Sequence, residues 1–427
     1  MVKLRHLICT FFAGLLIVSA GAIAEDKPFG MPPEWTKQEA VWIGWPVFDY
    51  PTDFVGGTMQ RPLADLRVKM IREIHSSSRV ALLVASNTAE NQAREYLRSA
   101  KIDLTKVDFV YAPFDDYFVR DVGPRFLSNG NRLKIADIPW NCYGTGEAVG
   151  GSYFEECLAR EANDGTVAKT MALETINGKT VSEGGGLEST STLLMGYLDT
   201  ALQRNPGMSK EEIEADYLKV YGKEKMIWLK KSPISDVPGY KIGRFFGWGA
   251  NGHVDEFARF VNETTVVIGQ IDEERINDPL ARADYETLKS NLADLKAARS
   301  VEGEPLTIIE MPVPDIALFA REFRLGDAPF PPSWKTLTDR FTDDDQILYV
   351  PAASYLNFVI TNDKILVPQY WEQGMPDFVR DDDQRAVKTL ESVFPGRTVV
   401  GINPLALNFF GGGMHCATQQ QPAVTTE

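Results

Sequence analysis

The strongest constraint on the fold is a repeated segment in which an extended stretch, a short polar turn and a second apolar strand follow one another. Three copies cover residues 121–138, 254–271 and 355–370, and a weaker copy covers residues 184–196. In the first three, Asn stands with Gly, Glu or Asp between runs rich in apolar and β-branched residues. This combination is typical of β-hairpins. The chain is therefore predicted to contain a series of related strand pairs.

Helical patterns separate these strand pairs. They cover residues 62–75, 209–222 and 279–300, and Ser209 with Glu212 three residues later predicts a capping box at the start of the second helix. Strand pairs that alternate with helices favour an α/β fold, and their recurrence favours a repeated module arranged around an axis. In such an array, the first strand of each unit brings its polar residues to a shared centre.

The first 24 residues have the order of a secretory signal peptide. Lys3 and Arg5 precede an apolar run that is short for a membrane span, and small residues end it at Ala24, where cleavage is expected. We therefore expect an exported protein, periplasmic or extracellular, without membrane association after cleavage. Residues 25–427 contain no linker and no compositional break, so they are expected to form one large domain.

Charge and cysteine content narrow the classes of function. The formal net charge is −15, which disfavours nucleic acid as a partner and favours cationic ligands. Beyond the signal segment, the cysteines are Cys142, Cys157 and Cys416. The first two are close enough in sequence to form a disulfide, which would leave Cys416 as a lone thiol. An incidental buried thiol is the alternative interpretation of Cys416.

The surroundings of Cys416 favour a functional role. It follows three glycines at residues 411–413, which let other groups approach the backbone closely. Two of the four histidines, His253 and His415, also lie beside glycines. Because a general acid or base that works near neutral pH is most often histidine, His253 is the best candidate and His415 a weaker one. On an extended strand, the side chains of His415 and Cys416 would point in opposite directions.

Carboxylates stand near these residues in the predicted fold. Asp121 and Asp255 lie at the beginning of two strand pairs, and on a strand Asp255 and His253 would share one face. Carboxylates beside a thiol oppose the oxyanion of a cysteine protease but suit a substrate that stays cationic. A guanidinium fits best, since its planar N–H donors match carboxylates bidentately. Two alternatives remain. One is a metal site made of Asp121, His253, Asp255 and Cys416, and the other is a guanidinium-binding protein without catalysis.

Ordered sequence blocks along nearly the whole chain resemble the agmatine deiminase and bacterial peptidyl-arginine deiminase family of the pentein superfamily. The blocks are MPPEWTKQEAVWIGWP at 31–46, DDYFVRDVGP at 115–124, EGGG at 183–186, RNPGMSKEEIE at 204–214, GHVDEFARF at 252–260, SYLNFVI at 354–360 and GGGMHCATQQQP at 411–422. The resemblance implies a five-bladed α/β propeller in a single domain, and no metal or organic cofactor. It also implies that a guanidinium substrate is hydrolysed, with release of ammonia and a ureido product.

The catalytic roles implied by the resemblance fall on three residues. Cys416 corresponds to the nucleophile that forms a covalent amidino-thioether. His253 corresponds to the residue that protonates the departing ammonia and then activates water. Glu183 corresponds to the acidic residue that orients this histidine.

The resemblance implies substrate contacts for four further residues. Asp121 and Asp255 correspond to the carboxylates that hold the guanidinium. Phe118 stands where the family usually has tryptophan, and its ring is expected to stack on the guanidinium. Asn357 falls in the SYLN block and is expected to contact the substrate.

Two departures from the family pattern bear on which substrate is used. Agmatine deiminases commonly have an acidic residue just before the histidine, where this chain has Gly, Ala and Asn at 249–251. Peptidyl enzymes hold a substrate carboxylate with arginines in a segment that here reads WNCYGTGE, residues 140–147. We therefore expect agmatine to be the best substrate and N-carbamoylputrescine its product, with the far end held mainly by shape and aromatic contact.

Other substrates and reactions remain as alternatives. An arginine-containing peptide is one, in which case Arg204 or Arg259 would have to receive the peptide carboxylate. Transfer of the amidino group to an amine is another. Association into a homo-oligomer is left open.

Overall fold

The computed structural model describes residues 27–46, 60–114, 116–144, 155, 157–247, 249–327, 342 and 344–425. The predicted signal peptide, residues 1–24, lies outside them. Within the described part of the chain, no helix is both long enough and apolar enough to cross a membrane.

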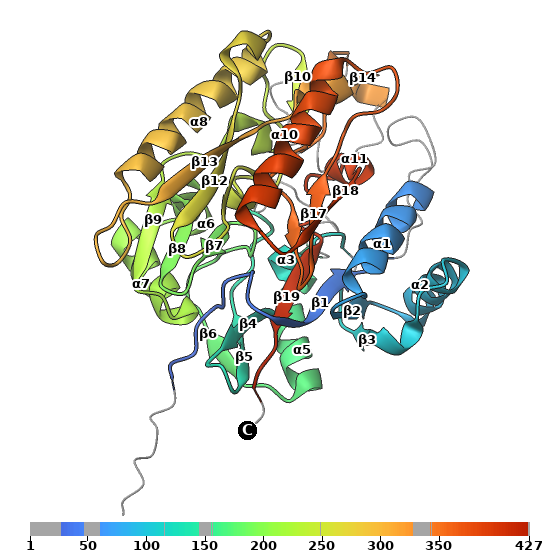
Figure 1. Cartoon of the computed structure of the whole chain (residues 1–427), viewed down its shortest axis with the longest axis vertical. Coiled ribbons are helices and arrows are strands. Elements are labelled where there is room, and N and C mark those ends of the chain that lie inside the picture. The colour runs from blue at the N-terminus through green and yellow to red at the C-terminus, as the bar shows by residue number, and fades with distance from the viewer. Residues whose placement is uncertain are drawn as a thin grey trace, which may run out of the picture.

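Five of the sheets repeat one pattern of strand pairing (Figure 1). In each, a first strand lies antiparallel to a second, and a third lies parallel to the second. In spatial order the sheets are β19 (Thr418–Pro422), β1 (Gln38–Gly44), β2 (Arg79–Val84) and β3 (Val107–Tyr111); β4 (Arg125–Ser128), β5 (Leu133–Asp137) and β6 (Thr175–Asn177); β7 (Leu187–Ser189), β8 (Leu193–Tyr197) and β9 (Lys225–Leu229); β11 (Ala258–Phe260), β12 (Thr265–Gln270) and β13 (Thr307–Pro312); and β16 (Val359–Ile360), β17 (Lys364–Pro368) and β18 (Thr398–Ile402).

Helices make the crossovers between the parallel strands of these sheets, as parallel pairing requires. The predicted helices are confirmed at α1, α7 and α8, and the Ser209–Glu212 capping box is present. The helices with their bounds are α1 (Gln60–Ile74), α2 (Asn87–Ser99), α3 (Val119–Val122), α5 (Ala162–Met171), α6 (Leu198–Arg204), α7 (Lys210–Tyr221), α8 (Pro279–Ala297), α10 (Asp377–Val393) and α11 (Leu405–Asn408).

All four predicted hairpins are confirmed as the antiparallel pairs β4–β5, β7–β8, β11–β12 and β16–β17. The turn between β4 and β5 illustrates why these residues form a hairpin. The Asn129 side chain accepts the backbone N–H of Asn131 and of Arg132, and Gly130 adopts a positive φ of 97° that a residue with a side chain disfavours.

The fifth unit is assembled from the two ends of the chain. The C-terminal strand β19 pairs antiparallel with β1, and β1 pairs parallel with β2. A large apolar cluster packs α1 and α2 onto this sheet and reaches Cys416, which is 1 % exposed. A further three-stranded sheet contains β10 (Phe245–Gly247), β15 (Gln346–Val350) and β14 (Arg321–Arg324).

The segments that lead into the first strands of the five units carry the predicted site residues. The prediction that Asp121 and Asp255 lie on the first strands is wrong, because a short helix and a 3₁₀ turn stand there instead. Asp121 lies in α3, Asp255 lies in the 3₁₀ turn η4 (Val254–Glu256), and Cys416 lies in a turn before β19. The arrangement of the five units as propeller blades stays a prediction, which the meeting of these segments supports.

Candidate active site

Cys416 lies in a turn where other side chains approach the backbone of the preceding glycines. A Cβ atom at Gly412 would lie 2.8 Å from Cε1 of Phe118 and 3.2 Å from Cβ of Cys416. The glycine therefore allows the Phe118 ring to lie against the segment that carries the thiol. Phe118 and Cys416 both belong to the apolar cluster that packs under α1.

Three polar side chains contact the Cys416 thiol. Its Sγ atom lies 3.1 Å from Nδ2 of Asn357, 3.5 Å from Oδ2 of Asp255 and 3.6 Å from Oε1 of Glu256. Burial, together with the negative charges of Asp255 and Glu256, raises the pKa of Cys416 well above its usual value. The thiol is therefore protonated at neutral pH until a positive charge arrives beside it.

Asn357 lies close to the nucleophile, at the position that the sequence assigned to substrate contact. Its Oδ1 accepts the backbone N–H of His415 at 2.8 Å, and its Nδ2 also donates to Glu256 at 3.0 Å. Asn357 therefore ties the nucleophile turn to η4. The sequence resemblance did not predict these protein contacts.

His253 is fully buried between two carboxylates. Its Nδ1 lies 3.7 Å from Oδ1 of Asp121, and its Nε2 lies 3.8 Å from Oε2 of Glu183. Burial opposes a charged ring, but Asp121 and Glu183 outweigh it and raise the pKa of His253 to about 9. Neither ring nitrogen has a hydrogen-bond partner within the described residues, and the same holds for Oδ1 of Asp255. Buried polar atoms without protein partners are rare, so these three atoms are available to a ligand or to water.

The stretch after Glu183 passes directly over these groups. A Cβ atom on Gly185 would lie 2.6 Å from Nδ1 of His253 and 3.0 Å from Oδ2 of Asp255, so a residue with a side chain does not fit. Glu183 itself pairs with Arg204 at 2.7 Å. Burial alone would raise the pKa of Glu183, but Arg204 and His253 lower it to about 2, which keeps this carboxylate charged.

The loop that carries His253 is shaped by Asp236, which sequence reasoning missed. The Asp236 carboxylate accepts the backbone N–H groups of Ala250, Gly252 and His253 at 2.7–2.8 Å. A buried carboxylate that accepts three backbone N–H groups of one loop fixes the loop, and with it the histidine. No local pattern links residue 236 to this loop, so only the structure could show the contact.

His415 faces the same carboxylate as Cys416, and the prediction that the two side chains point apart is wrong. Residues 414–417 form a turn, and Nδ1 of His415 lies 2.6 Å from Oδ2 of Asp255. Its Nε2 lies 2.8 Å from Oε1 of Glu34 and 3.0 Å from Nη2 of Arg259. Because of this turn, His415 and Cys416 both contact the same carboxylate oxygen, Oδ2 of Asp255.

Glu256 and Glu34 are further members of the site that sequence reasoning did not single out. Glu256 directly follows Asp255, and burial, Asp255 and Asp236 raise its pKa well above the usual value. Adjacency to the HVD residues was a usable signal for Glu256. For Glu34 the only signal was its place in the MPPEW block.

The four residues considered above as an alternative metal site are not gathered as four ligands in the described chain. The groups in the described chain whose ligand atoms lie within 4.8 Å of one another are Asp255 with Glu256 and Cys416, and Glu34 with Glu188 and His415. Neither contains His253 or Asp121. Of these four residues, only Asp255 contacts the thiol in the described chain, and His253 lies instead against Asp121 and Glu183.

The two arginines considered for a peptide carboxylate are already engaged by the protein. Arg204 is 1 % exposed and binds Glu183 and the carbonyl oxygens of residues 250 and 251. Arg259 is fully buried and binds Glu34, Glu188 and the carbonyl oxygens of residues 356 and 358. Neither is free to receive a substrate carboxylate.

An acidic pocket borders the site. Glu256, which contacts the Cys416 thiol, and Asp236, which binds the loop of His253, also line this pocket. The remaining acidic lining residues come from the segments after β12 and β13: Asp272, Asp278, Asp284 and Asp315. The charged side chain that opposes them is Arg275, which is itself paired with Asp382. Such a lining favours a cation and disfavours a carboxylate.

Comparison with known proteins places the chain among deiminases. A family model described as Porphyromonas-type peptidyl-arginine deiminase matches residues 30–422. The agmatine deiminase of Ectopseudomonas mendocina is 28 % identical over 403 residues, which is 92 % of this chain and 96 % of that protein.

Solved structures share the fold. The agmatine deiminase of Enterococcus faecalis aligns with a TM-score of 0.71 at 23 % identity, covering 94 % of this chain and 99 % of that one. The agmatine deiminase of C. jejuni aligns with a TM-score of 0.64 at 18 % identity, covering 92 % and 96 %. The fold is thus the α/β fold of the pentein superfamily, and the chain belongs to the Porphyromonas-type peptidyl-arginine deiminase family.

Proposed function

We propose that this protein hydrolyses the guanidinium group of agmatine, releasing ammonia and N-carbamoylputrescine. One observation carries the proposal: a buried thiol contacts the Asp255 carboxylate, and the neighbouring His253 lies between Asp121 and Glu183 with its ring nitrogens and Oδ1 of Asp255 left without protein partners. A planar cation with several N–H donors satisfies the unpaired carboxylate oxygen. The class of reaction is therefore hydrolysis of a C–N bond in an amidine.

The charges around Cys416 explain how the nucleophile is activated. Carboxylates hold the proton on Cys416, and the protonated His253 is the cation that balances them. When a guanidinium binds between Asp121 and Asp255, its charge favours the thiolate, since an opposite charge nearby stabilises the ionised form. The Cys416 proton passes to solvent water, because His253 is already protonated. The substrate therefore helps to produce its own nucleophile.

The reaction proceeds in two steps. The Cys416 thiolate forms a bond to the guanidinium carbon, and the C–N bond breaks as His253 gives its proton to the departing ammonia. Water then attacks the amidino-thioether and His253 takes one proton from this water. The C–S bond breaks to restore the thiolate, and the second proton of the water is released to solvent as the ureido C=O bond forms. The product is the ureido compound.

The preference for agmatine over arginine follows from charge. The site borders the acidic pocket, and both Arg204 and Arg259 are bound to protein groups. A substrate carboxylate would be repelled there, and repulsion of the wrong ligand contributes strongly to specificity. Agmatine carries a second amine instead of a carboxylate. The relative from Ectopseudomonas mendocina, named agmatine deiminase, adds support.

A substrate panel tests this function. Purified residues 25–427 are incubated with agmatine, free arginine and peptides with a C-terminal arginine, and both ammonia and the ureido product are measured. We expect agmatine to give the highest kcat/KM and Cys416→Ser to give no turnover, because a hydroxyl is far less acidic than a thiol. A rate on arginine peptides far above that on agmatine would contradict the substrate.

The covalent step has its own test. Acid quenching during turnover of agmatine, followed by intact mass measurement, is expected to show an amidino adduct that maps to Cys416. Turnover without any adduct, and with an active Cys416→Ser variant, would remove the thiol from the mechanism.

We also propose that residues 1–24 direct export. The basic start, the apolar run and the small residues at the end support this. Expression of the whole chain in a bacterial host, followed by sequencing of the N-terminus in the periplasm or medium, is expected to find a start at Glu25. Recovery of the uncleaved chain in the cytoplasm would refute export.

A further inference from the structure

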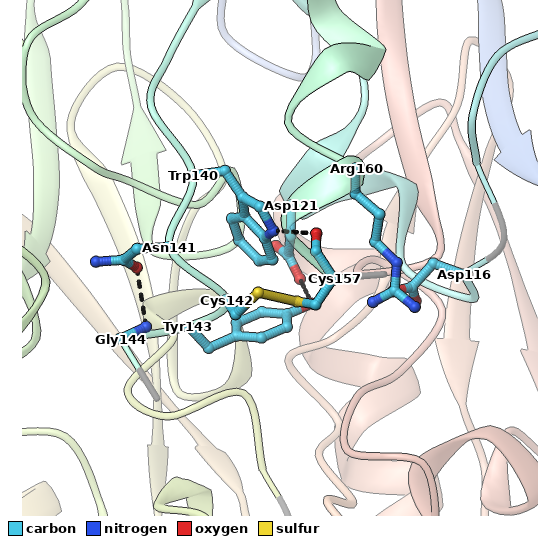
Figure 2. The surroundings of a disulfide bond; sticks show 9 residues. All are labelled: Asp116, Asp121, Trp140, Asn141, Cys142, Tyr143, Gly144, Cys157 and Arg160. Atoms are coloured by element: carbon cyan, nitrogen blue, oxygen red, sulfur yellow. Dashed lines mark hydrogen bonds and ion pairs between the residues drawn. A yellow bond between two sulfur atoms is a disulfide. The ribbon is translucent and has the colours of Figure 1, made fainter. Parts of the chain in front are cut away.

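The disulfide between Cys142 and Cys157 lies beside the proposed guanidinium site (Figure 2). The pairing that the sequence allowed but left open is present, and both residues are buried, with 2 % and 1 % exposed. Tyr143 directly follows the first cysteine and points toward Asp121 in Figure 2. The bridge therefore adjoins a residue that contacts the site.

Tyr143 contacts two of the residues assigned to the reaction. Its hydroxyl donates a hydrogen bond to Oδ2 of Asp121 at 3.0 Å, while Gly185 N–H donates to Oδ1 of the same carboxylate at 3.2 Å. Its ring centroid lies 5.8 Å from that of His253. On its other side, the ring packs edge-on against Trp140 at 4.7 Å. Tyr143 thus fixes one oxygen of a carboxylate that must face the substrate.

The backbone at this point is held in an unfavourable conformation. Cys142 and Tyr143 have φ values of 55° and 58°, in the left-handed region that costs a residue with a side chain free energy. Two hydrogen bonds support the conformation: Asn251 Nδ2 donates to the Tyr143 carbonyl at 2.8 Å, and Gly144 N–H donates to Oδ1 of Asn141 at 2.9 Å. A covalent bridge at the first of the two strained residues adds a constraint that these bonds alone do not supply.

The second cysteine is anchored to the same region as Asp121. Trp140 Nε1 donates to the Cys157 carbonyl at 2.9 Å. Arg160 forms an ion pair with Asp116 at 2.6 Å, and Asp116 accepts the backbone N–H of Phe118, just before α3. The bridge therefore connects Tyr143 to a segment that is itself attached to the helix carrying Asp121.

We propose that Tyr143 is a positioning residue for Asp121, and that the Cys142–Cys157 disulfide holds it there, so that full activity requires the oxidised bridge while Cys416 stays a thiol. This inference rests on the proposed deiminase function. Reduction by a dithiol transfers two electrons to the bridge: the S–S bond breaks, Cys142 and Cys157 each gain a proton, and the dithiol becomes a disulfide. Released from the bridge, the segment can leave the left-handed conformation, and the hydroxyl then no longer meets Asp121.

The loss of this donor has a measurable signature. An ionised carboxylate is stabilised by each hydrogen bond that it accepts, so removal of the Tyr143 hydroxyl raises the pKa of Asp121. We expect kcat/KM to fall at low pH as Asp121 takes up a proton, and this acid limb of the pH profile then moves to higher pH. KM for agmatine also rises at neutral pH. A merely structural role would lower the amount of folded enzyme without moving the limb.

The experiment compares Tyr143→Phe, the double variant Cys142→Ser with Cys157→Ser, and the triple variant. We expect Tyr143→Phe to lower kcat/KM on agmatine at neutral pH by about tenfold, in line with a hydrogen bond to a charged group. The double variant is expected to lose about three- to tenfold. The triple variant is expected to equal Tyr143→Phe, because both changes remove the same contact.

A matched control comes from a second buried tyrosine. The Tyr355 hydroxyl donates to Oδ1 of Asp383 at 2.7 Å, and Asp383 lies on α10. Tyr355→Phe removes the same kind of hydrogen bond and is expected to leave the acid limb unchanged. A limb shift in Tyr355→Phe as large as in Tyr143→Phe would contradict a specific role for Tyr143.

Redox titration completes the test. Wild-type enzyme is equilibrated with dithiothreitol buffers, the bridge is quantified by non-reducing peptide mapping, and activity is measured at each point. We expect activity to fall in proportion to bridge reduction in the wild type and to stay constant in the double variant. Wild-type activity that is unaffected by complete reduction, or losses that add up in the triple variant, would overturn the inference. Absence of wild-type activity on all guanidino substrates would instead overturn the proposed function.

Discussion

Asp121 and Asp255 are assigned the same task, yet their surroundings differ. Asp121 accepts hydrogen bonds from the neutral donors Tyr143 and Gly185, whereas Asp255 accepts one from His415 at 2.6 Å. Burial raises the pKa of Asp121 to about 6, with Asp255 and Glu183 reinforcing the shift and His253 opposing it. Burial also acts on Asp255, but His415 outweighs it and lowers the pKa.

The difference shows what keeps a buried carboxylate ionised. Neutral donors offset only part of the desolvation penalty, whereas a histidine that is itself held by Glu34 and Arg259 offsets more. Asp255 is therefore charged throughout the working pH range. Asp121 is charged only above about pH 6, or when a cationic substrate is bound.

The largest effect is expected from Asp255→Asn. The change removes the charge beside both Cys416 and the proposed guanidinium, and it leaves His415 without its carboxylate. Loss of charge-assisted bonds of about 1.5–3 kcal/mol each corresponds to a fall in kcat/KM of at least about 100-fold when two are lost. Steady-state kinetics on agmatine measure this. A loss no greater than that of Asp121→Asn would abolish the distinction between the two carboxylates.

The same substitution is expected to destabilise the folded protein. A carboxylate whose folded pKa lies below its unfolded value near 4 contributes stability above that value and loses it as pH falls through the folded pKa. Asp255→Asn should therefore lower Tm at pH 7.5. An unchanged Tm would show that His415 does not need its partner.

Asp121→Asn is expected to lower kcat/KM by at least about tenfold and yet to raise Tm at neutral pH. A folded pKa of about 6 above an unfolded value near 3.9 means that folding binds the proton, so ionised Asp121 costs on the order of 3 kcal/mol of stability above pH 6. The penalty disappears as pH falls toward 4. Differential scanning calorimetry at pH 7.5, where the penalty is present, and at pH 4.5, where it has largely disappeared, measures this difference in Tm. A lower Tm of the variant at both pH values would show that ionised Asp121 does not destabilise the fold.

The pH profile of the wild type sharpens the same comparison. We expect kcat/KM to fall below about pH 6 as Asp121 takes up a proton and to fall above about pH 9 as His253 loses one, since kcat/KM reports the free enzyme. In Asp121→Asn the acid limb should disappear. Persistence of the limb at the same pH would assign it to another group.

The smallest effect is expected from Glu256→Gln. Glu256 touches the thiol, but burial together with Asp255 and Asp236 raises its pKa, which disfavours its anionic form. A neutral amide of similar shape is therefore expected to change kcat/KM less than about threefold. Glu183→Gln is the matched counterpart, because the pKa of Glu183 is lowered to about 2 and its charge would be lost. A larger loss in Glu256→Gln than in Glu183→Gln would show that Glu256 works as an anion.

Local patterns predicted much of the fold. Turn residues such as Asn129 and Gly130 and the capping pair at the start of α7 act within a few positions, so the sequence alone revealed the hairpins and helices. The residues proposed for catalysis could be picked out from their types and the family-like blocks. The structure places His253 between Asp121 and Glu183, and it places Cys416 against Asp255.

The parts that could not be predicted depend on contacts between distant segments. His415 and Glu34 are separated by 381 positions, and no periodicity links them. The short helix η4 and the turn at residues 414–417 replace the expected strands, because loops that enclose a ligand site follow the tertiary packing around them rather than strand propensity. Which of two aspartates is reliably charged depends on such contacts.

The pairing of β1 with β19 also has a consequence for the order in which the chain is made. About 370 residues separate the two strands, so at a synthesis rate of about 5–20 residues per second, β1 waits tens of seconds for its partner. During this time the apolar strand QEAVWIG presents an open edge to other nascent chains. Because the nucleophile precedes β19 by two positions, the enzyme also stays inactive until its last strand has been synthesised.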